Sequence, residues 1–242
     1  YEICACLVGS EMCIRDRKPM VRKYIIDSLC YWASEYHIDG FRFDLMGVLD
    51  IETLNEARKA LLKINPDIIM YGEGWTGGES TLPESERGMK INAPRTPGIG
   101  MFSDDIRDAV KGHVFYMDEL GFVNGAADRG EELKQAVTCA KWAKSPMQSI
   151  NYLSCHDNYT LWDRFIISNS HESEEMRIRM NKLAAAILFT AQGIPFFLHG
   201  EEFARTKISE ADGTPVENSY CSPLSVLSLI HISEPTRHAQ IS

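Results

Sequence analysis

Three acidic residues stand in equivalent places along the sequence. Asp44, Glu73 and Asp157 each end, or closely follow, a short apolar run that is typical of a buried strand. Because the carboxyl ends of parallel strands meet at one edge of a sheet, we expect these three side chains to lie close together. Paired carboxylates can divide the work of a reaction, one donating a proton and the other attacking, and glycoside hydrolysis requires this division.

The neighbours of two of these acids favour different roles. Glu73 lies between Tyr71 and Trp75, and aromatic surroundings of this kind would favour the protonated form that a proton donor needs. Asp44 has Arg42 two residues earlier on the same strand face, and the positive charge would keep Asp44 ionised and nucleophilic. A single acid at a strand end more often caps a helix or pairs with a surface cation. Three such acids, each beside an aromatic, arginine or histidine residue, favour a catalytic site.

No metal or cofactor is predicted. His156 and Asp157 are adjacent and could both bind a metal, but a metal site needs three or more protein ligands. The cysteines of the central sequence are odd in number and widely spaced, without a C-x-x-C zinc pattern or a disulfide framework. They are Cys30, Cys139 and Cys155. Calcium is possible, but the sequence does not indicate it.

Helical and strand patterns alternate along the chain. Apolar residues recur at helical spacing in residues 19–36, 51–62, 104–111, 131–144 and 174–191, and strand-like runs occupy residues 41–44, 68–71, 149–153 and 194–198. Residues 76–100 hold many Gly and Pro and are typical of a long loop. The alternation predicts an α/β fold with a parallel sheet and crossover helices. No G-x-G-x-x-G follows a strand, so the acids at the strand ends favour a (β/α)8 TIM barrel over an open doubly wound sheet.

The composition is that of an ordinary globular protein. The chain has 242 residues, 44% of them hydrophobic and 24% charged, which excludes the collagen-like and intrinsically disordered classes. The net charge of −9 gives no electrostatic basis for binding nucleic acid or an anionic membrane. No apolar run approaches the roughly 20 residues of a membrane helix. The length fits one domain of the larger kind.

The two ends of the chain do not resemble protein. A single short DNA sequence can encode both ends. One strand encodes Leu227–Arg237, and the reverse complement, translated from its second base, encodes Leu7–Asp16. Neither folding nor selection would place two strands of one DNA sequence at the two ends of a protein. This DNA sequence resembles a sequencing adapter. We therefore expect residues 1–16 and 227–242 to be translated adapter and residues 17–226 to be a piece of a longer gene. Localisation, cytoplasmic or secreted from a bacterium, stays open.

Three motifs carry a resemblance to the α-amylase family of glycoside hydrolases. The segments DGFRFDLMG (39–47), YGEGWTGG (71–78) and INYLSCHDNYTLWDR (150–164) are similar to the family's second, third and fourth signature regions, in the expected order. Within the family, GEGW, residues 97–115 and HGEEFARTK (199–207) resemble the type I pullulanase branch. The first signature region is absent, so the resemblance implies a partial (β/α)8 barrel with about strands four to eight.

Carried over residue by residue, the resemblance implies roles for six residues. Asp44 would be the nucleophile, Glu73 the general acid/base, and Asp157 the third carboxylate, which supports the distorted sugar at the transition state. The substrate-binding positions of the family are matched by Arg42, Trp75 and His156.

The implied activity is retaining hydrolysis of α-1,6-glucosidic branches in pullulan, amylopectin or glycogen dextrins. A branched α-glucan would be the partner, no cofactor would be required, and the chain by itself would be inactive. Three alternatives stay open: another α-glucan hydrolase or transferase, such as an isoamylase-like debranching enzyme; a non-catalytic carbohydrate-binding relative; and a piece of a gene that does not fold by itself. The oligomeric state is open as well.

Overall fold

The computed structural model describes residues 19–217, except residues 79 and 210–211. The predicted adapter segments 1–16 and 227–242, with their boundaries, lie outside the described residues. The chain divides into two compact units. Unit 1 holds the residues up to Phe102 together with Cys139–Ile150, and unit 2 holds Ser103–Thr138 and the residues from Asn151 onward.

The strands follow one another in the order β1-β2-β3-β4-β5, so each strand lies beside the next one along the chain. They are β1 (Gly40–Phe43), β2 (Ile69–Gly72), β3 (Gly100–Ser103), β4 (Ser149–Tyr152) and β5 (Ile194–Phe196). β1 pairs with β2 in parallel, and β2 pairs with β3 in parallel. Strands in chain order with helices between them are typical of a (β/α) barrel. The four predicted strands are confirmed, and β3 is a strand that the sequence pattern does not predict.

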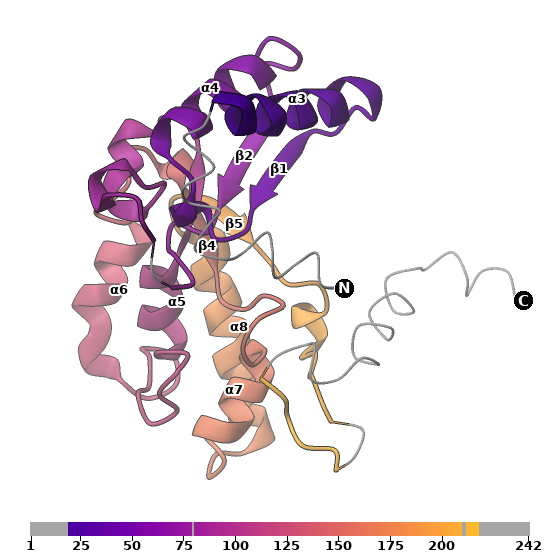
Figure 1. The fold of residues 1–242 in the computed structure, drawn as a ribbon. Coiled ribbons are helices and arrows are strands. Elements are labelled where there is room, and N and C mark those ends of the chain that lie inside the picture. Colours follow the sequence, from indigo (N-terminus) through magenta and orange to yellow (C-terminus); the bar gives the residue numbers. More distant parts are fainter. Residues whose placement is uncertain (1–18, 79, 210–211, 218–242) are drawn as a thin grey trace, which may run out of the picture. The chain divides into compact units, whose positions relative to one another are not determined.

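In the described residues, six α-helices accompany these strands: α3 precedes β1, and the others lie between strands (Figure 1). They are α3 (Pro19–Glu35), α4 (Ile51–Leu61), α5 (Asp104–Lys111), α6 (Gly130–Val137), α7 (Leu161–Ser168) and α8 (Glu174–Thr190). Short 3₁₀ turns are η1 (Met46–Val48), η2 (Glu84–Glu86), η3 (Lys90–Arg95), η4 (Ala127–Arg129), η5 (Pro146–Gln148) and η6 (Glu201–Phe203). Three α-helices begin at a side-chain cap that accepts a backbone N–H, which satisfies one of the unpaired donors of the first turn. The caps are Asp50 for α4, Thr160 for α7 and Ser173 for α8.

Two helical predictions need correction. The helix expected over residues 131–144 ends at Val137. Thr138 donates its hydroxyl back to the carbonyl of Lys134, and Cys139 has a φ of 101°, a conformation that cannot continue a helix. α7 is not predicted by periodicity, because eight residues give too short a window for a helical pattern to stand out.

In unit 1, α3 and α4 pack together and lie next to β1 and β2 (Figure 1). Arg22 of α3 joins the two helices, since its guanidinium donates to the Thr53 hydroxyl at 3.0 Å and to Asp50 at 3.2 Å. The buried side chains of this core are apolar and come from both helices, the strands and the loops between them. They are Ala33, Met46, Leu49, Leu54, Ala57, Leu61, Ile68, Met70, Ala93, Ile99 and Met101.

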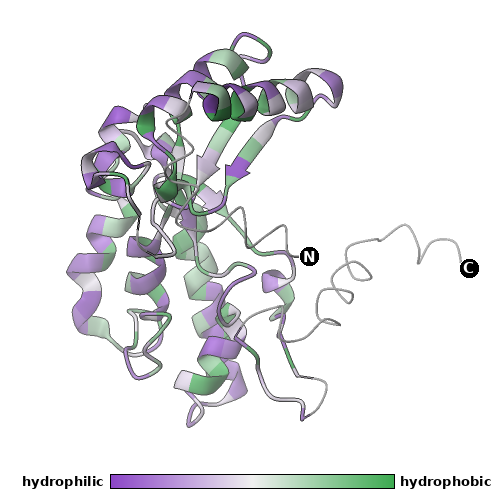
Figure 2. Cartoon of the chain, viewed as in Figure 1, coloured by the Kyte–Doolittle hydropathy of each residue, from purple (hydrophilic) through white to green (hydrophobic). Residues whose placement is uncertain are grey.

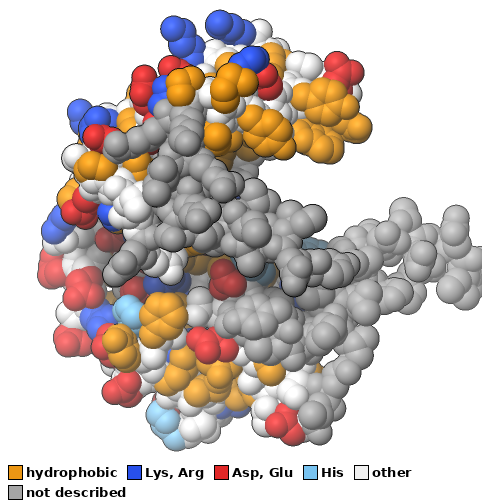
Figure 3. Space-filling view, in the orientation of Figure 1, with side chains coloured by type: hydrophobic (Ala, Val, Ile, Leu, Met, Phe, Trp, Pro, Cys, Tyr) orange, Lys and Arg blue, Asp and Glu red, His pale blue; other side chains and the backbone are white. Residues whose placement is uncertain are grey.

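The outer surface of α3 is aromatic. Tyr31, Trp32 and Tyr36 remain 53%, 41% and 58% exposed although their rings contact one another, with centroids 4.6–6.0 Å apart. Figure 3 shows hydrophobic side chains gathered over this helix. The inward face of α3 instead carries smaller aliphatic groups, such as Ile25 and Leu29.

In unit 2, α5 packs on α6 and α7 packs on α8. Each of these helices carries hydrophilic and hydrophobic residues side by side (Figure 2), as expected where one face is buried and the other solvated. The buried apolar residues are Ile106, Ala109, Val110, Val123, Ala136, Leu153, Leu161, Phe165, Met180, Ala184 and Leu188. Within the described part of the chain, the helices are too short or too polar to cross a membrane.

Candidate active site

The register of β1 and β2 brings two of the predicted acids together. Phe43 is opposite Gly72 in this parallel pair, and the Glu73 N–H donates to the Phe43 carbonyl at 3.1 Å. Asp44 and Glu73 are the next residues on their respective chains, so they stand at neighbouring strand ends. This part of the predicted arrangement is confirmed. The expected separation of about 5–5.5 Å between their carboxylates, which a retaining mechanism needs, stays a prediction.

Arg42 connects the two acids. Its Nη1 contacts Asp44 Oδ1 at 2.9 Å, as the two-residue spacing predicts, and its Nη2 contacts Glu73 Oε1, also at 2.9 Å. The second contact runs across the sheet from β1 to the end of β2, and no local sequence pattern indicates it. Charge-assisted hydrogen bonds of this length are strong and directional. One guanidinium therefore sets the positions of both carboxylates.

The turn after Asp44 supports Glu73 from the other side. The Leu45 N–H donates to Glu73 Oε2 at 2.7 Å, and Leu45 adopts a left-handed conformation with a φ of 43°. A non-glycine residue in this region is uncommon and strained. Gly47 follows, and its N–H donates to the carbonyls of Glu73 and Trp75 at 3.2 and 3.1 Å. A Cβ at residue 47 would lie 2.5 Å from the Trp75 carbonyl, so only glycine fits this approach.

The two carboxylates have different environments. The Glu73 residue is 7% exposed, whereas the Asp44 side chain is 68% exposed. Tyr71 lies beside this region and packs its ring edge-on against Phe102, with centroids 5.6 Å apart. One acid is therefore desolvated and the other is accessible, and which of them donates the proton stays a prediction.

Trp75 also lies in unit 1, directly after the Glu73 strand end. The Lys90 ammonium sits over its ring, 5.3 Å from the centroid, which is the geometry of a cation–π contact. The ring is therefore held in place by a neighbour within the protein. Its role in binding sugar stays a prediction.

His156 and Asp157 belong to unit 2, in the turn that follows β4. His156 Nε2 lies 3.4 Å from Asp157 Oδ2, and the side chains are 60% and 46% exposed. Asn158 has a φ of 60°, which bends the chain immediately after the acid. The expectation that Asp157 joins Asp44 and Glu73 at one edge stays a prediction.

Lys207 holds the turn around Asp157 in shape. Its Nζ donates to the carbonyl oxygens of His156 at 3.0 Å, of Asn158, and of Glu217 at 2.9 Å. The residue is 1% exposed, and burial lowers the pKa of its ammonium. Sequence reasoning did not indicate this contact, because Lys207 is 51 positions away from His156 and only the fold brings them together.

Buried polar groups lie beneath the same turn. The Ser154 hydroxyl donates to Glu201 Oε2 at 2.6 Å, and burial raises the pKa of Glu201. Lys111 of α5 is buried as well, and loss of hydration lowers its pKa to about 8. Attraction between Lys111 and Glu201 opposes both shifts. Such a network resists rearrangement, because breaking any pair would leave a charge without compensation.

The geometry and the comparisons with known proteins define the class of this protein. The family profile described as "Alpha amylase, catalytic domain" matches residues 12–222. The chain therefore belongs to the α-amylase family, and its fold is part of the (β/α)8 barrel, as predicted.

Within this family, the chain is similar to pullulanases. It is 40% identical over 226 residues to "Pullulanase" of Bacillus subtilis (strain 168), covering 90% of this chain and 30% of the relative. It is 32% identical over 254 residues to "Pullulanase 1, chloroplastic" of Arabidopsis thaliana, covering 80% of this chain and 26% of the relative. A solved pullulanase of Anoxybacillus sp. LM18-11, complexed with maltotetraose, matches with 47% identity and a TM-score of 0.82, over 87% of this chain and 30% of that one. The chain thus spans about a third or less of the length of these relatives.

Proposed function

We propose that the whole protein containing this chain is a debranching glycoside hydrolase that cleaves α-1,6-glucosidic bonds in pullulan, amylopectin or glycogen dextrins with retention of configuration. The observation that carries the proposal is the Arg42-bridged pair of Asp44 and Glu73 at neighbouring strand ends. The similarity to pullulanases supports the substrate class.

In the proposed mechanism, the two acids act in two steps. Protonated Glu73 gives its proton to the glycosidic oxygen while the Asp44 carboxylate attacks the anomeric carbon, so the sugar–oxygen bond breaks and a glycosyl ester forms. The Glu73 carboxylate then takes a proton from water, whose oxygen attacks the same carbon and releases Asp44. Two inversions give net retention. Carboxylates and water suffice for this chemistry, so we propose that no cofactor takes part.

The remaining residues have binding and supporting roles in the proposal. Asp157 supports the distorted sugar at the transition state, and His156 binds the sugar that is cleaved. Arg42 aligns the two acids, and Trp75 contacts the substrate through its ring. These roles follow the family resemblance and the contacts described above.

The test is to assay the whole protein on pullulan, glycogen and linear amylose while following the anomeric configuration of the product. We expect cleavage of pullulan and of branched glycogen, negligible cleavage of amylose, and a product that retains the α configuration. Equal activity on amylose would favour another α-glucan hydrolase. A protein that binds pullulan but never cleaves it would be a carbohydrate-binding relative.

Replacing Arg42 by methionine is expected to lower kcat/KM on pullulan by about 10²- to 10³-fold, the cost of losing a preorganised charged donor. Arg42→Met removes both contacts at once, so neither carboxylate keeps its position. Arg42→Lys keeps the positive charge, but an ammonium lacks the planar guanidinium that contacts both acids. We therefore expect an intermediate loss of kcat/KM. Steady-state kinetics of both variants check this. Arg179→Met, at an exposed ion pair of α8, is the control and should match the parent; equal activity of Arg42→Met would contradict the bridging role.

Lys207→Met is expected to lower kcat by about 10²-fold and to change KM much less, because a small displacement of Asp157 costs rate more than binding. The substitution removes three hydrogen bonds that hold the turn. The kinetics are measured well below the melting temperature, so that lost stability alone cannot produce the effect. Lys134→Met, at an exposed pair with Glu131, is the matched control. A variant with unchanged kcat and only a lower melting temperature would limit Lys207 to a structural role.

A further inference from the structure

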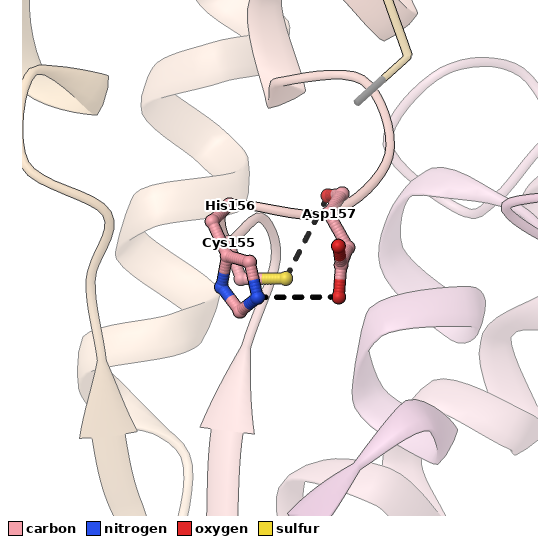
Figure 4. A group of neighbouring side chains, drawn as sticks. All are labelled: Cys155, His156 and Asp157. Atoms are coloured by element: carbon pink, nitrogen blue, oxygen red, sulfur yellow. Dashed lines mark hydrogen bonds and ion pairs between the residues drawn. The ribbon is translucent and has the colours of Figure 1, made fainter. Parts of the chain in front are cut away.

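Three consecutive side chains converge in the turn after β4. Cys155 offers a thiol, His156 an imidazole nitrogen and Asp157 a carboxylate oxygen, and these atoms all lie within 4.8 Å of one another (Figure 4). Consecutive residues of an extended chain point in opposite directions, so this convergence depends on the bend at the turn. The sequence showed only the His156–Asp157 pair as possible ligands, and the fold adds the sulfur as a third.

The donor set matches a soft divalent cation. Sulfur, imidazole and carboxylate are all ligands of Zn²⁺, and three protein ligands with water in the fourth position are typical of an open zinc site. Zinc–ligand distances imply that ligand atoms lie about 3.3–3.6 Å apart in a tetrahedral site. The three atoms lie within 4.8 Å of one another, so the widest pair must approach by up to about 1.5 Å to bind one ion. Calcium and magnesium prefer oxygen ligands, so the thiol and imidazole select against them.

The surroundings permit an ion to enter and stay. The His156 and Asp157 side chains are 60% and 46% exposed, which leaves a path from solvent. Lys111 and Lys207 are both cations near Cys155. The Lys207 ammonium donates to the carbonyl oxygens of His156, Asn158 and Glu217 and thereby holds the turn closed. A thiolate and a carboxylate together neutralise the two charges of the ion.

We propose that Cys155, His156 and Asp157 form a binding site for a thiophilic divalent cation such as Zn²⁺, with water as the fourth ligand. One consequence rests on the proposed function: His156 and Asp157 are the residues to which that function assigns the sugar. The ion and the α-glucan therefore exclude each other, and the metal inhibits the enzyme.

Cobalt(II) is the probe for this site, because thiolate ligation gives a charge-transfer band in the near ultraviolet and tetrahedral geometry gives strong visible bands. The chain has six other cysteines, at positions 4, 6, 13, 30, 139 and 221, and their replacement by serine leaves Cys155 as the single thiol. We expect this variant to bind one equivalent of Co²⁺ with both sets of bands, and Zn²⁺ to displace it. Adding Cys155→Ser should abolish the charge-transfer band.

Two further variants test the other ligands. His156→Gln and Asp157→Asn, each in the single-thiol background, should weaken Co²⁺ affinity by about tenfold or more. Unchanged affinity in both, or absence of the bands at stoichiometric Co²⁺, would overturn the proposal. In the chain with all its cysteines, Cys155→Ser should lower the bound Co²⁺ by one equivalent, whereas Cys139→Ser should not; this comparison does not depend on the multiple variant folding. No glucan is present, so failure of the metal site is distinguishable from failure of the proposed hydrolysis.

Discussion

Glu73→Gln is expected to lower turnover of pullulan by the whole protein about 10²- to 10⁴-fold, the usual contribution of general acid–base catalysis. Glutamine keeps the size of the side chain but can neither give nor take the proton. Because Glu73 is buried and both its oxygens accept hydrogen bonds, from Arg42 and from the Leu45 N–H, the amide also leaves one donor without an acceptor. We therefore expect a loss of stability of about 1–3 kcal/mol as well.

The activity of Glu73→Gln on substrates with different leaving groups tests whether Glu73 is the general acid/base. An aryl glycoside with a good leaving group needs little protonation, so its first step should be nearly normal in the variant. The second step still lacks a base, and azide, which attacks without losing a proton, should speed release of the sugar. Stopped-flow and steady-state measurements check both steps. Glu175→Gln, at an exposed pair of α8, is the control, and equal losses on pullulan and on the aryl substrate would argue against a proton donor.

Asp44→Asn is expected to lower turnover still further, by about 10⁴- to 10⁶-fold, a loss of the size seen when a nucleophile is removed. Neither an activated leaving group nor azide should restore it, because the glycosyl ester cannot form. Binding of maltotetraose should stay largely intact, since Asp44 is not expected to hold the remote sugars. Stability should change by less than about 1 kcal/mol, because the Asp44 side chain is 68% exposed and its contact with Arg42 is partly solvated.

Kinetics, calorimetric binding and thermal unfolding of Asp44→Asn give the three readouts. Asp27→Asn, at an exposed pair of α3, should behave as the parent and serves as the isosteric control. Turnover of Asp44→Asn within tenfold of the parent, or an inverted product from the parent, would remove Asp44 from the nucleophile role. The two carboxylate variants together separate the proton donor from the nucleophile, since only Glu73→Gln responds to the leaving group.

The sequence by itself determined most of the helices and strands and indicated the residues that we propose for the chemistry. Periodicity located α3, α4, α5 and α8, and Asp50 was identified as the cap of α4 from its position before an apolar face. The spacing of Arg42 and Asp44 predicted their contact, because side chains two residues apart on a strand share a face. The motifs placed the chain in its family. Each of these inferences depends on residues close together in the chain, where local geometry depends least on the rest of the fold.

Only the tertiary structure decided which distant groups meet. The register of β1 against β2 placed Glu73 next to Asp44 and within reach of Arg42, and a register slip of one residue would have separated them. Residues 104–111 were predicted correctly as a helix, yet nothing local indicated that Lys111 in it would be buried near Glu201. Lys207 and the turn at His156 are a further case.

The difference has one physical reason. A hydrophobic period or a cap is set by interactions within one or two turns of chain, so the sequence shows it directly. Other features depend on the combined effect of many weak contacts across the fold. They are the strand register, the left-handed turn at Leu45 and the convergence of Cys155 with His156 and Asp157. Each residue contributes only a small part of these contacts, so no single position in the sequence indicates the result. The residue types of this protein therefore indicate which chemistry is available, and packing decides how the side chains are arranged.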